Sequence, residues 1–103
     1  MTKKEHMTAA EARAALKKVK GWHLKADGKT ISREFVTKDF MSAVDLIQRV
    51  AVIAESENHH PDIHLTSYRK LRLELSTHDQ GGLTEKDFRE AGMINDLPVE
   101  LKR

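Results

Sequence analysis

The sequence predicts an α+β fold in which three helices pack on one face of a four-stranded antiparallel sheet, in the order α-β-β-α-β-β-α. Two stretches carry apolar residues at the alternating spacing of β-strands, and each contains a turn signal near its centre. Three other stretches, which precede, separate and follow these two, carry apolar residues at intervals of three and four. Because hairpins join antiparallel neighbours, this alternation argues against a parallel doubly wound sheet.

The chain is short enough to form one domain. It has 103 residues, of which 39% are hydrophobic and 33% are charged, a mixture typical of globular proteins. No internal repeat, low-complexity segment or linker divides it. We therefore expect a single domain over residues 1–103, with residues 1–6 as a flexible N-terminal tail.

The first helix is expected to begin after Thr8. Thr8 and Glu11 fit a capping box, in which each side chain accepts a hydrogen bond from the backbone N–H of the other residue. Gly21 ends the helical run. The apolar residues at helical spacing are Ala12, Ala15, Leu16 and Val19.

The first hairpin is centred on Asp27–Gly28, a dipeptide suited to the positive φ angles of a tight type I′ turn. Arg33 falls on the otherwise apolar side of the second strand, so we expect it near a sheet edge or reaching over the rim of the core. The apolar residues at strand spacing are Trp22, Leu24, Ile31 and Phe35.

The longest helix is expected from about Lys38 to Glu57, with Thr37 or Asp39 as its N-cap. Its apolar stripe is wide, which indicates that the helix is covered on more than one side, either by the sheet plus another helix or by a partner subunit. The stripe comprises Phe40, Val44, Ile47, Ala51 and Ala54, widened by Val50 and Ile53.

The second hairpin follows Pro61 and turns at Tyr68–Arg69–Lys70. Its apolar residues alternate with polar ones, as in an antiparallel sheet that has one face in water. They are Ile63, Leu65, Leu71, Leu73 and Leu75.

The last helix is expected to begin after Gly81–Gly82 and to reach about Leu97, where Pro98 stops it. Thr84 is the expected N-cap, with Asp87 at the third helical position. The apolar residues are Leu83 and Phe88, at the spacing of a hydrophobic staple, followed by Ala91 and Ile94.

Three histidines are expected at one end of the sheet. His59 and His60 directly follow the long helix, and His78 follows the last strand. The strand after Pro61 runs away from the helix end and its partner returns to it, so three imidazoles can converge on one cleft. His64 alternates with apolar neighbours and is expected on the opposite, polar face.

Imidazoles suit acid–base chemistry because their free pKa of about 6.5 permits both protonation states near neutral pH. Acid–base catalysis requires one group that donates a proton and another that accepts one, and several imidazoles can divide these roles. Cysteine is absent, so disulfides and thiolate chemistry are excluded. Taken singly, several residues have simpler explanations: Asp87 as a helix cap, Glu55 as a solvated helix residue, and His6 and His23 as surface residues.

A zinc site is the competing explanation, since His59, His60, His64 and His78 all offer nitrogen ligands. Adjacent residues on extended chain point to opposite faces, however, so His59 and His60 would not readily share one ion. The helical His-x-x-x-His zinc pattern is also absent, because His60 and His64 straddle Pro61. We therefore expect no metal site and keep metal-dependent hydrolysis as the weaker alternative.

Charge and hydropathy argue against nucleic-acid and membrane partners. The net charge is +2, with 18 Lys+Arg and 16 Asp+Glu interspersed, and the densest basic groups, residues 17–20 and 69–72, are expected to be solvated surface. No apolar run approaches the ~20 residues of a membrane span. The first residues lack the apolar segment of a signal peptide, so we expect a cytoplasmic protein.

The spacing of the histidines and their neighbours is distinctive. The run Glu55-Ser-Glu-Asn-His59-His60-Pro61 is followed by Tyr68 after six residues, His78 after nine more and Asp87 after a further eight. This pattern resembles the signature of the pterin-4a-carbinolamine dehydratase family. The resemblance extends from about Trp22 to Phe88, and includes Gly21–Trp22, Asp39–Phe40 and the run from Thr77 to Thr84.

The resemblance implies an enzyme that converts 4a-hydroxytetrahydropterin to quinonoid dihydropterin and water, without metal or organic cofactor, and so recycles the cofactor of aromatic amino acid hydroxylases. It implies that Asp87 orients His78, although a helix-capping role explains Asp87 equally well. We expect His59 and His78 to be the proton-transfer pair and His60 to orient the pterin. The residues placed in or beside the pterin pocket by the resemblance are His59, His60, His78, Glu55, Pro61 and Asp87.

The resemblance also implies partners. Members of the family self-associate, so a homodimer or homotetramer is expected, and some animal members bind a homeodomain transcription factor. No feature of this sequence indicates that second role. Relatives without the histidines serve in assembly or interaction, so a homo-oligomeric binding, assembly or coactivator module is the alternative function.

Overall fold

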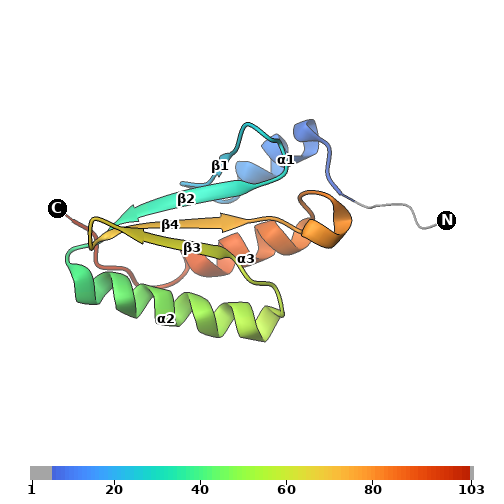
Figure 1. Cartoon of the computed structure of the whole chain (residues 1–103). Helices are drawn as coiled ribbons and strands as arrows, with labels where there is room; N and C mark the ends of the chain where they lie inside the picture. Colours follow the sequence, from blue (N-terminus) through green and yellow to red (C-terminus); the bar gives the residue numbers. More distant parts are fainter. Residues whose placement is uncertain (1–5, 103) are drawn as a thin grey trace.

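The computed structural model describes residues 6–102, which form one sheet with helices packed against it (Figure 1). The helices and strands follow one another in the predicted order α-β-β-α-β-β-α, which is confirmed, and one short 3-10 helix, η1, is present in addition. In chain order the elements are α1 (Ala9–Leu16), β1 (His23–Leu24), β2 (Ile31–Val36), α2 (Phe40–Glu57), β3 (Asp62–Thr66), β4 (Lys70–Leu75), η1 (His78–Gln80) and α3 (Glu85–Asn95).

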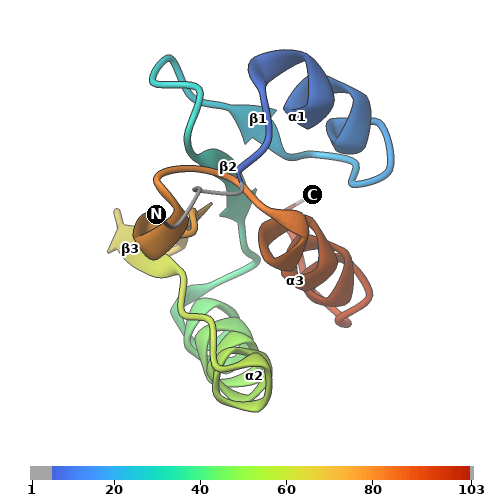
Figure 2. The same ribbon diagram turned by 90° about the vertical axis from the view of Figure 1, so that its right-hand side faces the viewer.

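The four strands form one antiparallel sheet in the order β1-β2-β4-β3. Viewed nearly along the strands in Figure 2, α1, α2 and α3 all lie on the same side of this sheet. Each hairpin therefore supplies one inner strand, β2 or β4, and one outer strand. The predicted α+β class, with helices on one face, is confirmed.

The two inner strands supply much of the core. Alternate residues of β2 and β4 point to the helical side, as the period of two requires, and Leu73 lies opposite Arg33 in the register. The intervening residues Arg72 and Glu74 face away from the helices and carry the charges of the other face. The buried core residues of these two strands are Ile31, Phe35, Leu71, Leu73 and Leu75.

Both predicted capping boxes are present. In α1 the Thr8 hydroxyl accepts from Glu11 N–H at 3.2 Å, and the Glu11 carboxylate accepts from Thr8 N–H at 2.8 Å. Thr84 and Asp87 do the same for α3. This helix ends at Asn95, with Asp96 as its C-cap, rather than at the predicted Leu97, whose N–H donates to the Ile94 carbonyl in a tighter final turn.

The α2 helix begins at Phe40 with Asp39 as its N-cap, whose carboxylate accepts from Ser42 N–H at 2.8 Å. The predicted stripe on α2 is wrong in part, since Phe40 and Ala51 are exposed. The face of α2 that packs on the sheet is rotated about the helix axis relative to the predicted face, and it carries both small and large side chains. Its buried members are Ala43, Leu46, Val50 and Ala54.

The tight type I′ turn predicted at Asp27–Gly28 is wrong. Of these two residues Gly28 alone has a positive φ, and its N–H donates to the Lys25 carbonyl at 2.9 Å. The Asp27 carboxylate accepts from Lys29 N–H and from the Thr30 hydroxyl, which closes a longer loop between β1 and β2.

Arg33 reaches over the rim of the core, as predicted. Its guanidinium carbon lies 4.2 Å from the centre of the Phe35 ring, and its Nη1 donates to Asn95 at the end of α3. Asn95 also accepts from the Trp22 indole at 2.9 Å. Gly21, with φ of 87°, leaves room for this arginine, because a Cβ there would lie 2.8 Å from the Arg33 Nε atom.

The predicted flexible tail, residues 1–6, lies outside the described residues except for His6, which is exposed. The His6 imidazole lies 3.1 Å from the Met7 carbonyl oxygen. Within residues 6–102 no helix has the length and apolar character needed to cross a bilayer.

Replacing Leu73 by alanine tests the central position of β4. Leu73 is fully buried, and truncation of such a leucine lowers the free energy of unfolding by about 2–5 kcal/mol. We expect equilibrium urea unfolding to show a loss in that range. Glu34→Ala, on the exposed face of the neighbouring strand, should change it by less than about 0.5 kcal/mol. Equal effects of the two substitutions would contradict this packing.

Candidate active site

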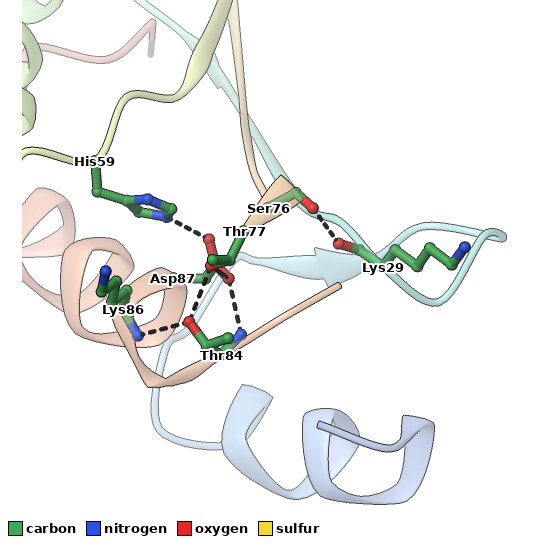
Figure 3. A network of polar contacts seen from close by, with 7 residues as sticks. All are labelled: Lys29, His59, Ser76, Thr77, Thr84, Lys86 and Asp87. Atoms are coloured by element: carbon green, nitrogen blue, oxygen red, sulfur yellow. Dashed lines mark hydrogen bonds and ion pairs between the residues drawn. The ribbon is translucent and has the colours of Figure 1, made fainter. Parts of the chain in front are cut away.

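A polar network joins the end of α2, the end of β4 and the start of α3 (Figure 3). At its centre, the His59 Nε2 atom lies 2.6 Å from the Asp87 Oδ1 atom. Asp87 is fully buried and the His59 side chain is 11% exposed. An ionised carboxylate only accepts hydrogen bonds, so Nε2 of His59 carries the proton that is donated to Asp87.

The second oxygen of Asp87 is also bonded. Its Oδ2 atom accepts from the Thr77 hydroxyl at 2.8 Å and from the Thr84 N–H at 2.9 Å. The hydroxyl oxygens of Thr84 and Thr77 are 2.9 Å apart. The Thr84 hydroxyl can therefore donate to Thr77 Oγ1, while the Thr77 hydroxyl donates its own proton to Asp87. Three donors therefore stabilise one buried charge that would otherwise be costly.

Asp87 combines the two roles that the sequence suggested as alternatives, with one correction. It is the helix cap of α3, and it also contacts a histidine. That histidine is His59, not His78 as predicted. The reason is the direction of α3, whose first turn points the Asp87 side chain toward the end of α2.

The C-terminus of α2 separates His59 from His60. Asn58 has a left-handed conformation with φ of 50°, and the His59 N–H donates to the Ala54 carbonyl at 3.1 Å. The chain then continues into Pro61, which restricts the preceding residue to extended backbone. As a result His59 turns inward to Asp87, while His60 is exposed.

His60 has an acidic partner of its own. Its Nε2 atom lies 2.5 Å from the Glu55 Oε2 atom, and the two side chains are 56% and 77% exposed. Glu55 lies in the last turn of α2, so it reaches the histidine over the end of the helix. Pro61 is half-buried.

His78 begins η1 and is exposed. It directly follows Thr77, so the Asp87 network anchors the backbone from which His78 projects. The Ser76 hydroxyl donates to the Lys29 carbonyl at 2.7 Å and ties this segment to the β1–β2 loop (Figure 3). Beside it is a hollow of about 250 Å³, lined by Asp27, Lys29, Thr30, Ser76, His78, Gly81 and Gly82.

The structure thus pairs His59 with Asp87 and His60 with Glu55. His78 follows Thr77, which donates to Asp87, but the hollow that His78 lines is lined by neither His59 nor His60, so the predicted convergence of the three imidazoles on one cleft stays a prediction. No hydrogen bond joins the three imidazoles to one another within residues 6–102. Tyr68, although part of the sequence pattern, lies in the β3–β4 turn at the other end of the hairpin and is 57% exposed.

The other histidines do not join this group. His64 is exposed and lies 3.6 Å from Glu74 on the face of the sheet away from the helices, as predicted. In the part of the chain that the structure describes, no group of three or more His, Asp or Glu side chains is arranged to hold a metal ion.

Thr77 and Glu90 were assigned no role from the sequence. Glu90 is fully buried, and neither of its oxygens has a hydrogen-bond partner among the described residues. The sequence did contain a signal for the burial of Glu90. Position 90 lies one helical turn after Asp87 and next to Ala91, which was expected on the buried face of the helix.

A wider basic hollow of about 780 Å³ lies between the C-terminal ends of α1 and α3 and contains none of the predicted site residues. Its lining includes Lys17, Lys18, Lys20, Arg33 and Arg89. We assign the candidate active site to the histidine group because that group holds the paired acids and bases.

Comparisons with known proteins agree on one family. The family model described as Pterin 4 alpha carbinolamine dehydratase matches residues 5–97. An Arabidopsis thaliana protein named pterin-4-alpha-carbinolamine dehydratase 2, mitochondrial, is 48% identical over 96 residues, which cover 91% of this chain and 51% of that protein. The chain therefore spans about half the length of this relative.

Solved structures give the same result for the fold. A Brucella melitensis protein described as a transcriptional coactivator/pterin dehydratase superposes with a TM-score of 0.80 and 35% identity, covering 88% of this chain and 96% of that one. A pterin dehydratase-like RuBisCO assembly factor of the alpha-carboxysome has a TM-score of 0.61 at 14% identity, covering 76% and 89%, and shows the fold alone. Because the family model matches residues 5–97 of the 103, this chain belongs to the pterin 4 alpha carbinolamine dehydratase family.

Proposed function

We propose that this chain catalyses the dehydration of a 4a-hydroxytetrahydropterin to a quinonoid dihydropterin and water by histidine general acid–base catalysis. The observation that carries the proposal is the contact of 2.6 Å between His59 and the buried Asp87 carboxylate. Membership of a dehydratase family supports the reaction class.

The reaction needs two proton transfers and no change of oxidation state. The hydroxyl on C4a accepts a proton and leaves as water when the C–O bond breaks. The proton on N5 is removed as the C4a=N5 double bond forms, so the sum of the two transfers is the loss of one water. One imidazolium and one neutral imidazole can supply both transfers near neutral pH.

The hydrogen bond to Asp87 prepares His59 for one of these transfers. Because Nε2 donates to the carboxylate, Nδ1 of the neutral ring holds the lone pair and can accept a proton. The negative charge of Asp87 also stabilises the imidazolium that results. This is the same physical logic by which a carboxylate fixes the tautomer of a catalytic histidine in other enzymes.

We assign the second transfer to His78 and the orientation of the pterin to His60. His78 is exposed beside a hollow and is free to exchange protons with a bound ligand. His60 is paired with the exposed carboxylate of Glu55, and an exposed charge stabilises an imidazolium less than the buried Asp87 does, so we assign His60 to hold the substrate rather than to exchange protons. In this proposal a separate reductase reduces the quinonoid dihydropterin product again, so the chain takes part in pterin recycling.

We also propose that the chain self-associates through α2. Three large apolar residues of this helix lie in water in the single chain, Phe40 at 50%, Met41 at 69% and Val52 at 71% exposure. Met41 and Val52 share one helix face, opposite the face that packs on the sheet. A cytoplasmic location remains a prediction from the sequence.

Replacing the histidines one at a time tests the assignment. Following the decay of chemically generated 4a-hydroxytetrahydropterin with chelator present, we expect His59→Ala and His78→Ala each to lower kcat by about 10²–10⁴-fold. His64→Ala, which removes an exposed imidazole on the other face of the sheet, should retain activity. No acceleration by the wild type would reject the enzymatic function, and a larger loss in His60→Ala than in His59→Ala would reverse the roles.

Asp87→Asn tests the carboxylate without removing the helix cap, because an amide oxygen can still accept from Thr84 N–H. The amide nitrogen then faces His59 Nε2, so both the negative charge and the acceptor for the Nε2 proton are lost, and we expect kcat to fall at least about tenfold. Circular dichroism and thermal unfolding serve as the control for folding. Full activity in a folded Asp87→Asn protein would disprove the role of the pair.

Val52→Asp tests self-association. A carboxylate in the centre of an apolar contact is expected to dissociate the oligomer, as measured by size-exclusion chromatography with light scattering. Ala14→Asp, which adds the same charge to an exposed position of α1, should leave the mass unchanged. A monomeric wild type, or an oligomer equally stable in both variants, would refute the α2 interface.

A further inference from the structure

The basic hollow between the C-terminal ends of α1 and α3 is a cavity that the proposed mechanism does not use. Its volume of about 780 Å³ lies within the range of small-molecule sites, about 300–1,000 Å³. It contains none of the predicted site residues, so an inference about it does not rest on the proposed function. Its charged lining residues are Lys17, Lys18, Lys20, Arg33 and Arg89, with Asp96 as the one acid.

Positive charge reaches this hollow from three separate elements. The three lysines follow the end of α1, whereas Arg33 comes from β2 and Arg89 from α3. A helix dipole favours cations near the C-terminus of the helix, which can account for the lysines after α1. It does not account for Arg33, which lies on a strand. Residues 17–20, expected from the sequence to be solvated surface, are thereby grouped with two arginines from distant parts of the chain.

Most of these cations have no counterion. Within residues 6–102, no carboxylate forms an ion pair with the three lysines or with Arg33, and only Arg89 is paired, with Glu57 at 3.1 Å. The single charge of Asp96 is outnumbered in the lining. Cations of one sign that line a cavity raise the local concentration of anions. The hollow therefore favours an anionic ligand.

Arg33 is held in place before any ligand binds. Its Nη1 donates to Asn95 and to the Lys20 carbonyl, and its guanidinium carbon lies 4.2 Å from the centre of the Phe35 ring. Asn95 is fixed in turn, because it accepts from the Trp22 indole at 2.9 Å and donates to the Lys20 carbonyl at 3.0 Å. The Nε and Nη2 groups of Arg33 have no acceptor among the described residues. A fixed guanidinium with unused donors loses little freedom when it binds an oxyanion.

The shape of the lining favours phosphate over other anions. No aromatic side chain lines the hollow, so a nucleobase has nothing to stack on and charge must carry the recognition. A carboxylate is planar and matches a single guanidinium fork, whereas a phosphate is tetrahedral and directs oxygens to several sides. Because the cations come from a strand and from two helices, a tetrahedral group can contact more of them at once.

We propose that this hollow binds a small ligand that carries two or more phosphate groups. Arg33 is the fixed anchor, and Lys17, Lys18 and Lys20 supply the surrounding positive charge. More than one phosphate group is required to neutralise these unpaired cations and to occupy the volume of the cavity.

Calorimetric titration of the full chain with inorganic tripolyphosphate at low ionic strength tests the site. We expect saturable binding that weakens as NaCl is added, because salt screens exposed charges. Lys17→Gln/Lys20→Gln removes two exposed ammonium groups and should lower the affinity by about tenfold. Lys70→Gln/Lys102→Gln, which removes the same charge from exposed lysines outside the hollow, is the matched control and should bind as the wild type does.

Arg33→Lys tests the anchor, since it keeps the charge and removes the planar fork. We expect weaker binding of tripolyphosphate in a protein whose circular dichroism and thermal unfolding show that it is folded. In ¹⁵N NMR spectra of the wild type, the amide signals of residues 17–21 and 89–96 should shift on addition of tripolyphosphate. Citrate serves as the comparison ligand, because it carries several carboxylates and no phosphate.

The outcomes separate the parts of the proposal. No binding of tripolyphosphate by the wild type, or equal affinity in the wild type and the Lys17→Gln/Lys20→Gln variant, would overturn the site. Citrate that binds as tightly as tripolyphosphate would overturn the assignment to phosphate. Unchanged affinity in folded Arg33→Lys would overturn the anchor.

Discussion

The structure of this end of the molecule depends on the burial of one carboxylate. Asp87 is inaccessible to water, so its charge must be met by donors from the protein. Those donors come from three places in the chain: the histidine after α2, the threonine at the end of β4 and the backbone at the start of α3. A single requirement for hydrogen bonds therefore fixes the relative positions of three elements and sets the orientation of His59.

The sheet explains why these elements meet where they do. Burial of Leu71, Leu73 and Leu75 on one face holds β4 beneath the helices. Because β3 and β4 form a hairpin, the chain that leaves the end of α2 returns to the same end of the sheet. The catalytic candidates thus lie at the open end of the hairpin, where loops and helix termini carry groups that the packed core could not accommodate.

The fold by itself does not decide the chemistry. A RuBisCO assembly factor shares this fold at 14% identity, so the same framework serves a protein of different description. The chemistry proposed for this chain depends on the set of acids and bases at the site, which includes two buried carboxyls in unlike surroundings. Asp87 accepts from three donors, whereas Glu90 has no hydrogen-bond partner among the described residues.

The sequence alone determined the elements, because spacing and capping are local properties: Thr8 with Glu11 and Thr84 with Asp87 both predicted helix starts that the structure confirms. It also placed His64 on the polar face, since strand alternation depends only on neighbours. Tertiary structure decided the rest. It chose Ala43 and Leu46 over Phe40 for the buried face of α2, lengthened the loop at Asp27–Gly28, and paired Asp87 with His59 rather than His78. These outcomes depend on how α2 and α3 approach each other across the sheet, and that geometry is set by packing between residues distant in sequence.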